Sequence, residues 1–91
     1  AGDLTLGSAG NAFSITGTTT INAITTTSWQ AGSIIILIFT STPTVKNNTA
    51  GGASTAKMLL NGGVDFSATA NDVLTLIYDG TNWLECSRSI N

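Results

Sequence analysis

Residues 33–39 read SIIILIF, the longest apolar run in the chain. The β-branched residues in this run favour a strand, in which successive side chains point to opposite faces of a sheet. A strand of a small antiparallel sheet normally has one apolar and one polar face. This strand has two apolar faces, so we expect one face to enter the core and the other to be covered by a further structure.

The cover of the second face is the main question that the sequence raises. We expect a neighbouring subunit to provide it, and we assign Ile35, Leu37 and Phe39 to that subunit interface. The alternative is a third layer or the N-terminal segment of the same chain. Without any cover, an uncharged run of this kind would be an aggregation segment.

The size of the chain also favours assembly. Its 91 residues form one domain, residues 1–91, and a domain of this size buries only roughly 60–65% of the surface that its unfolded chain exposes. Cys86 is the only cysteine and histidine is absent, so neither an internal disulfide nor a zinc site is expected. Oligomerisation is the remaining source of stability. We expect the chain to be the C-terminal part of a longer protein.

The composition excludes several classes of partner. Charged residues make up 9% of the chain and the formal net charge is −2, whereas about 25% is usual for a soluble domain. There is no basic patch for nucleic acid, and no apolar run approaches the roughly 20 residues of a membrane-spanning helix. Thr, Ser, Asn and Gly supply the polar surface, as is typical of extracellular and virion structural proteins.

Short strands and turns occupy the rest of the sequence. Alternating side chains on both sides of Asp79–Gly80 predict a hairpin with arms at 73–78 and 83–89. Ile21 and Ile24 are three residues apart, which requires a bend if both are to face the core. Further strands are expected within residues 3–7, 11–17, 43–47, 57–60 and 64–69, with a glycine-rich loop at 47–56. This pattern predicts an all-β fold, a small antiparallel β-sandwich of jelly-roll type.

Three stretches, taken together, resemble a known family. They are GNAFSITGTTTINAI at 10–24, the WxxGSIIxLxF pattern at 29–39, and LLNGGVDFSATANDVLTLIYDGTNWLECSRS at 59–89. In this order they are similar to the β-sandwich domain of bacteriophage tailspikes and tail fibres, which also recurs in prophage-encoded virion proteins. The likeness extends over roughly residues 3–89.

The resemblance implies a homotrimeric structural module, closely packed or intertwined around a threefold axis. Such a module stabilises or caps the fibre in the virion, outside the cell, and sometimes assists host attachment. Its partners would be further copies of itself, the upstream domains of the same spike and a host-surface glycan. Glu85 and Arg88 would form a polar pair that we add to the candidate trimer interface. The framework residues carried over are Phe66, Leu74, Leu76, Tyr78 and Trp83, with Asp79 and Gly80 in a turn.

No catalytic, cofactor or metal site is expected, and the chain is not expected to be an enzyme. Asp65, Asp72 and Asp79 each adjoin turn residues, where an aspartate hydrogen-bonds nearby backbone groups. A calcium or sodium site built from these acids is the alternative. Cys86 has no histidine to activate it, and we expect it to be a small buried residue.

Aromatic side chains offer a second possible function. Trp29, Trp83 and Tyr78 could stack on sugar rings, which would make the chain a carbohydrate-binding module. The competing interpretation is that these rings pack in the core or at a subunit interface. An exposed aromatic strip, above all at Trp29, would favour sugar binding.

Overall fold

The fold is all-β, as predicted. The computed structural model describes residues 3–4, 11–27 and 29–91. Helical structure in this part of the chain is confined to the 3-10 turn η1, Asn61–Gly63, and no described helix is long and apolar enough to cross a membrane. The strands are β1 Asp3–Leu4, β2 Ala12–Ile15, β3 Ala23–Thr25, β4 Ile34–Phe39, β5 Thr44–Val45, β6 Thr55–Leu59, β7 Phe66–Ser67, β8 Val73–Tyr78 and β9 Trp83–Ser89.

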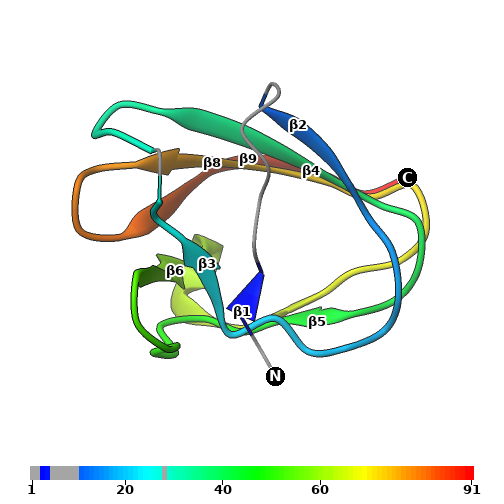
Figure 1. The fold of residues 1–91 in the computed structure, drawn as a ribbon. Helices are drawn as coiled ribbons and strands as arrows, with labels where there is room; N and C mark the ends of the chain where they lie inside the picture. The colour runs from blue at the N-terminus through cyan, green and yellow to red at the C-terminus, as the bar shows by residue number, and fades with distance from the viewer. Residues whose placement is uncertain (1–2, 5–10, 28) are drawn as a thin grey trace.

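One curled sheet dominates the structure (Figure 1). Its strand order is β1-β3-β6-β9-β8-β4-β2, and β5 and β7 form a separate two-stranded sheet. The sheet is mixed: β1 with β3, β2 with β4, and β6 with β9 are parallel pairs, and the other neighbours are antiparallel. The prediction of an antiparallel sheet is therefore wrong. Strands distant in the sequence become neighbours, and such pairs are free to run in either direction.

The predicted hairpin is confirmed with its predicted arms, β8 and β9. Asp79 closes the turn, because its Oδ1 accepts hydrogen bonds from the backbone N–H groups of Thr81 and Asn82 at 2.8 and 2.6 Å. Gly80 has a φ of +97°, a backbone conformation that glycine adopts without a steric penalty. The turn chemistry read from Asp79–Gly80 therefore matches the structure.

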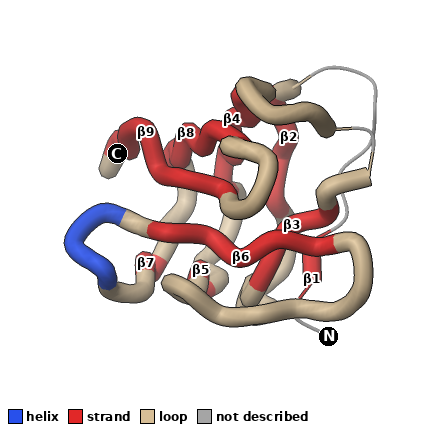
Figure 2. The backbone as a smooth tube through the Cα atoms, turned by 90° about the vertical axis from the view of Figure 1, so that its left-hand side faces the viewer, coloured by secondary structure: helices blue, strands red, loops and turns tan. Residues whose placement is uncertain are grey.

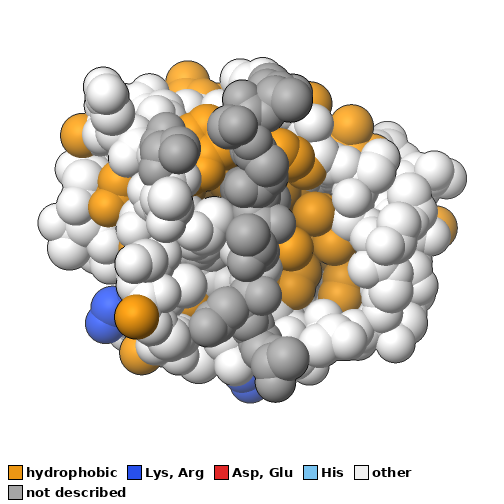
Figure 3. Space-filling model, in the orientation of Figure 1, with side chains coloured by type: hydrophobic (Ala, Val, Ile, Leu, Met, Phe, Trp, Pro, Cys, Tyr) orange, Lys and Arg blue, Asp and Glu red, His pale blue; other side chains and the backbone are white. Residues whose placement is uncertain are grey.

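The curl places the core between two parts of the same sheet. In Figure 1, β2, β4, β8 and β9 lie above and β3, β6 and β1 lie below, with β5 near the lower part. Figure 2 shows η1 following the end of β6. In the face drawn in Figure 3, hydrophobic side chains gather beside the residues that are not described. The largest fully buried hydrophobic side chains are Trp83, Phe39, Ile24, Ile35, Leu37, Met58, Leu74, Leu76 and Val45.

The structure reverses the assignment of faces on β4. Ile35, Leu37 and Phe39 have no exposed surface, because they project into the core enclosed by the curled sheet. The assignment of these three residues to a subunit interface is therefore wrong. The opposite face is the open one, and there Ile34 and Ile38 remain 44% and 37% exposed.

The bend expected between Ile21 and Ile24 is confirmed. Ile21 forms an isolated bridge with Val45 of β5, whereas Ile24 belongs to β3 and pairs with Ala56 of β6. Both isoleucines are buried. The segment therefore passes from one sheet to the other while it keeps both side chains inside.

Candidate functional site

The outer face of the large sheet carries a row of branched aliphatic side chains. Ile34 of β4 lies opposite Ile77 of β8, Ile77 lies opposite Leu84 of β9, and Leu84 lies opposite Leu59 of β6. Paired residues share a face of the sheet. The four side chains therefore form one continuous row across four strands.

Two further rows run beside the first one. In the second, Ile36 lies opposite Thr75, which lies opposite Ser87. In the third, Ile38 pairs with Val73, which pairs with Ser89. None of the side chains in the three rows is charged. We refer to Ile34, Ile36, Ile38, Val73, Thr75, Ile77, Leu84 and Leu59 as the outer apolar face.

The outer apolar face lies on the solvent side of the described structure. Ile34 and Ile38 rank among the exposed large hydrophobic residues, and the other members are partly exposed. Scattered exposed aliphatic residues are normal, but a contiguous patch marks an interaction surface. The cross-strand register makes this patch contiguous, so it is the strongest candidate for a functional site.

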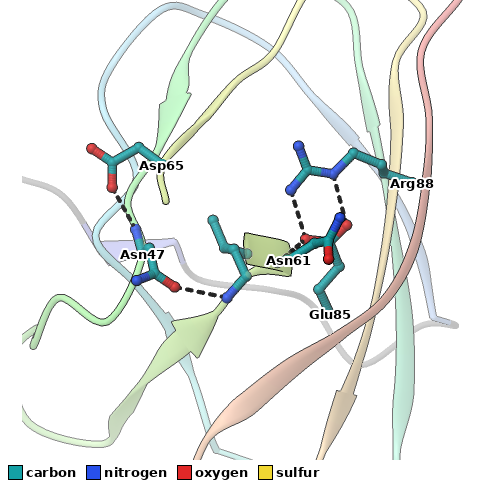
Figure 4. Close-up of polar contacts among 6 residues, drawn as sticks. Asn47, Asn61, Asp65, Glu85 and Arg88 are labelled. Carbon is teal, nitrogen blue, oxygen red and sulfur yellow. Dashed lines mark hydrogen bonds and ion pairs between the residues drawn. The ribbon is translucent and has the colours of Figure 1, made fainter. Parts of the chain in front are cut away.

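Glu85 and Arg88 lie on the inner side of β9 and bind each other. Arg88 donates from Nε to Oε2 and from Nη2 to Oε1 of Glu85, both at 2.7 Å (Figure 4). The Glu85 side chain is 3% exposed, and the Arg88 guanidinium lies 4.3 Å from the centre of the Phe66 ring. The predicted polar pair is thus confirmed. Its assignment to a subunit interface stays a prediction, and within one protein the two side chains contact each other and the ring of Phe66.

The pair also connects two strands that diverge. β6 pairs with β9 only at Met58–Trp83 and Leu59–Leu84, and beyond this point the backbone N–H of Asn61 donates to Glu85 Oε1 at 2.8 Å. The hydrogen bonds from Arg88 hold the pKa of Glu85 below its usual value, and Glu85 in turn raises the pKa of Arg88. Where β6 and β9 separate, the Glu85 carboxylate therefore takes the place of a backbone hydrogen bond between the two strands.

A second polar cluster holds the loop after β5. Asn47 donates its backbone N–H to Asp65 Oδ1, and its own Oδ1 accepts the Leu60 N–H, both at 2.8 Å (Figure 4). Lys46 pairs with Asp65 at 3.1 Å, and both side chains are exposed. The Asn47 hydrogen bond, followed by Lys46, lowers the pKa of Asp65. Each contact ties loop to loop, so the role is structural.

The other two aspartates also hold turns. Asp72 is 1% exposed and accepts the Thr69 N–H, the Thr69 hydroxyl and the Asn91 N–H. Backbone hydrogen bonds from Thr69 and Asn91 lower the pKa of Asp72, and those from Asn82 and Thr81 lower the pKa of Asp79. The described residues contain no group of three or more potential metal-ligating side chains.

The aromatic residues named for sugar binding pack against one another. Trp29 lies edge-on to Phe13 and to Trp83, with ring centres 6.1 and 6.0 Å apart, and Tyr78 lies 4.9 Å from Trp83. Trp83 has no exposed surface, and the indole N–H groups of Trp29 and Trp83 find no acceptor in the described structure. A buried Trp83 offers no ring face to a sugar, so this assignment is wrong for Trp83.

Cys86 is exposed, contrary to its expected burial. The register of β8 with β9 shifts between Thr75 and Leu76, where Glu85 and Ser87 take successive partners and Cys86 is the extra residue. A bulge of this kind changes the face on which the following residues lie. Cys86 lines a polar hollow of about 460 Å³ together with Leu59, Leu60, Asn61, Glu85, Ser87 and Arg88.

Comparisons with known proteins do not identify the protein. No protein-family model, no curated protein and no solved structure matches it. The sequence interpretation missed the role of Ile34, Ile38 and Ile77 on the outer apolar face. The alternation of the hairpin arm at 73–78 could have revealed this face. If Leu74 and Leu76 point into the core, Val73 and Ile77 must point to the opposite face of the sheet.

Proposed function

We propose that the protein is a structural module that self-associates through its outer apolar face. The observation that supports this proposal is the continuous row from Ile34 through Ile77 and Leu84 to Leu59. Further copies of the same uncharged face, meeting at a shared axis, are a suitable cover, because they expose no charge that would be buried without a partner.

In this proposal the curled sheet forms a small jelly-roll-like sandwich, and three copies pack around a threefold axis. The sequence resemblance to the β-sandwich domain of phage tailspikes and tail fibres supports this arrangement. The module would stabilise or cap a fibre of the virion, outside the cell, next to upstream domains of the same spike. It has no catalytic role in this proposal.

The dimensions of the molecule are compatible with such an interface. Its principal extents are 29 × 26 × 24 Å, so one side of the molecule is comparable with the roughly 800 Å² that each partner contributes to a standard interface. Apolar burial contributes about 25 cal/mol per Å², which is partly offset by the cost of association. Burial of the exposed parts of the outer apolar face would therefore favour assembly.

The test is the solution mass of the protein, measured by light scattering on a sizing column at low micromolar concentration. We expect a mass of three times 9.3 kDa. A lysine in place of Ile38 would have to be buried without a partner, so the Ile38→Lys variant should elute as a monomer. Val64→Lys is the matched control, because Val64 is 62% exposed and lies outside the outer apolar face.

Two results would contradict the proposal. One is a monomeric parent protein at the concentrations tested. The other is an Ile38→Lys variant that keeps the mass of the parent, which would place the interface elsewhere. Circular dichroism of both variants would establish that each retains its sheet structure.

A further inference from the structure

Asn61 and Gly62 form a chemically reactive pair at the end of β6. The sequence contains eight asparagines, and Asn61 is the one followed by glycine. Both residues lie in η1 and are exposed. We propose that the folded protein modifies itself at this pair, by deamidation of Asn61 to aspartate and isoaspartate.

The surroundings of Gly62 permit the reaction. Its nitrogen must reach Cγ of Asn61, and a side chain on residue 62 would obstruct that approach. A Cβ built on Gly62 would meet only Val64 Cγ2, at 3.9 Å, and a Cβ on Gly63 would meet nothing within 4 Å. Within this turn the backbone N–H of Gly63 donates to the carbonyl oxygen of Leu60 at 3.0 Å. The space beside both glycines is therefore largely open.

The reaction needs only water and a general base from the solvent. The deprotonated backbone nitrogen of Gly62 attacks Cγ of Asn61, an N–C bond forms, the bond between Cγ and Nδ2 of Asn61 breaks, and ammonia leaves. Water then opens the resulting succinimide at either of its two carbonyl groups. Attack at one carbonyl gives aspartate and attack at the other gives isoaspartate, so the net change is the gain of water and the loss of ammonia.

The side chains of three other asparagines are held by hydrogen bonds. The Asn47 side chain accepts the Leu60 N–H, the Asn11 side-chain amide donates to the carbonyl oxygen of Ile34, and the Asn91 side-chain amide donates to the backbone carbonyl of Asn71. Asn82 precedes Trp83, which is fully buried. The Asn61 side-chain amide makes no hydrogen bond to any residue that the structure describes. Asn61 therefore combines a side-chain amide without a hydrogen bond and a following glycine, a combination that no other asparagine in the sequence offers.

The product would place a new carboxylate beside an existing one. The backbone N–H of Asn61 donates to Glu85 Oε1 at 2.8 Å, and Glu85 is bound to Arg88. A negative charge at residue 61 repels Glu85 and competes for Arg88. Isoaspartate additionally lengthens the backbone by one carbon at the turn. Both products should loosen the contact that joins the end of β6 to β9.

The experiment is incubation of the intact native protein in mildly alkaline buffer, followed by peptide mapping with mass spectrometry and an isoaspartate-specific methylation assay. We expect the modification to accumulate at residue 61 before any other asparagine, to accelerate as the pH rises, and to be lost in Asn61→Gln. A synthetic peptide of residues 58–66 gives the rate of deamidation at Asn61 in the absence of folded structure. Modification of that peptide while the native protein stays unmodified would overturn the proposal, as would prior modification at Asn71 or Asn82.

Discussion

Arg88 binds Glu85 through two hydrogen bonds of 2.7 Å while its guanidinium covers the ring of Phe66. One side chain thus neutralises a nearly buried carboxylate and closes the core above an aromatic ring. Arginine suits this position because its fork matches a carboxylate and its plane stacks on a ring. Removal of the guanidinium should therefore affect stability through the carboxylate that it neutralises.

We expect Arg88→Met to destabilise the protein by about 1–3 kcal/mol, because Glu85 is left as a nearly buried charge without its main partner. Methionine keeps an apolar contact with Phe66, so the loss reports mainly on the charge. Urea unfolding measures the change. The double variant Arg88→Met with Glu85→Gln removes the orphan charge and should recover part of the loss. A double variant less stable than Arg88→Met would refute this explanation.

The two faces of β4 should respond differently to the same substitution. Ile35→Ala creates a cavity in the core, and we expect it to cost about 2–5 kcal/mol. Ile38→Ala removes a side chain that is 37% exposed, and it should cost about 1 kcal/mol or less. Urea unfolding at concentrations too low for self-association measures both values. Equal losses would mean that the faces are assigned incorrectly.

Acid should destabilise the protein through its carboxylates. The pKa values of Asp65, Asp72, Asp79 and Glu85 are lowered in the folded state. A lowered carboxyl pKa contributes stability above the unfolded value of about 4, and this contribution is lost as the pH falls through the folded pKa. The free energy of unfolding should therefore be flat near neutral pH and fall below about pH 4.

Asp79→Asn provides the control for this pH dependence. The amide oxygen still accepts the turn hydrogen bonds but no longer titrates in acid, so the decline in stability should be shallower than in the parent protein. Unfolding followed by tryptophan fluorescence across the acid range measures the slope. An unchanged slope would show that Asp79 does not contribute.

Asn47 should contribute more to the free energy of unfolding than its exposed neighbour Lys46. Asn47→Ala removes the acceptor for the N–H of buried Leu60, and we expect a loss of about 1–3 kcal/mol. Lys46→Ala breaks only the exposed ion pair with Asp65 and should cost about 1 kcal/mol or less. Thermal unfolding compares the two. A larger loss for Lys46→Ala would contradict this ranking.

Gly80→Ala tests the conformation of the hairpin turn. At a φ of +97° an alanine is strained, and its Cβ would meet that of Ala31 at 3.4 Å. We expect a loss of about 1–3 kcal/mol. Thr81→Ala in the same turn keeps the backbone hydrogen bond to Asp79 and should be nearly neutral. Differential scanning calorimetry measures both, and equal losses would show that the turn conformation does not require glycine.

Local patterns predicted the elements well. The hairpin of β8 and β9 follows from the alternation on both sides of Asp79–Gly80, and turn residues mark most other boundaries. These signals are local, because an Asp–Gly turn and an alternating arm depend on neighbours in the sequence. The all-β class follows from them directly.

Local patterns could not predict which side chains of β4 face the core. They also could not predict which strands pair with one another in the sheet. Six consecutive apolar residues carry no alternation, so only the curl of the sheet decides that Ile35 is inside and Ile38 is outside. The parallel pairing of β6 with β9 joins segments far apart in the sequence. The position of Cys86 depends on the bulge between Glu85 and Ser87, which no residue in the sequence marks.

The order of strands in the sheet also bears on how the protein folds. Among the described strands, β8 and β9 are the one pair of neighbours in the large sheet that are consecutive in the sequence, and β1 and β2 lie at opposite edges. When distant segments pair, the chain loses loop-closure entropy before the new contacts stabilise it. Proteins dominated by such pairings therefore fold slowly, in about milliseconds to seconds. The hairpin is the part that can form early, and β4 then docks on β8. The edge strand β2 can join only after β4 is in place, so the N-terminal part of the sheet should be the last to acquire protection from hydrogen exchange during refolding.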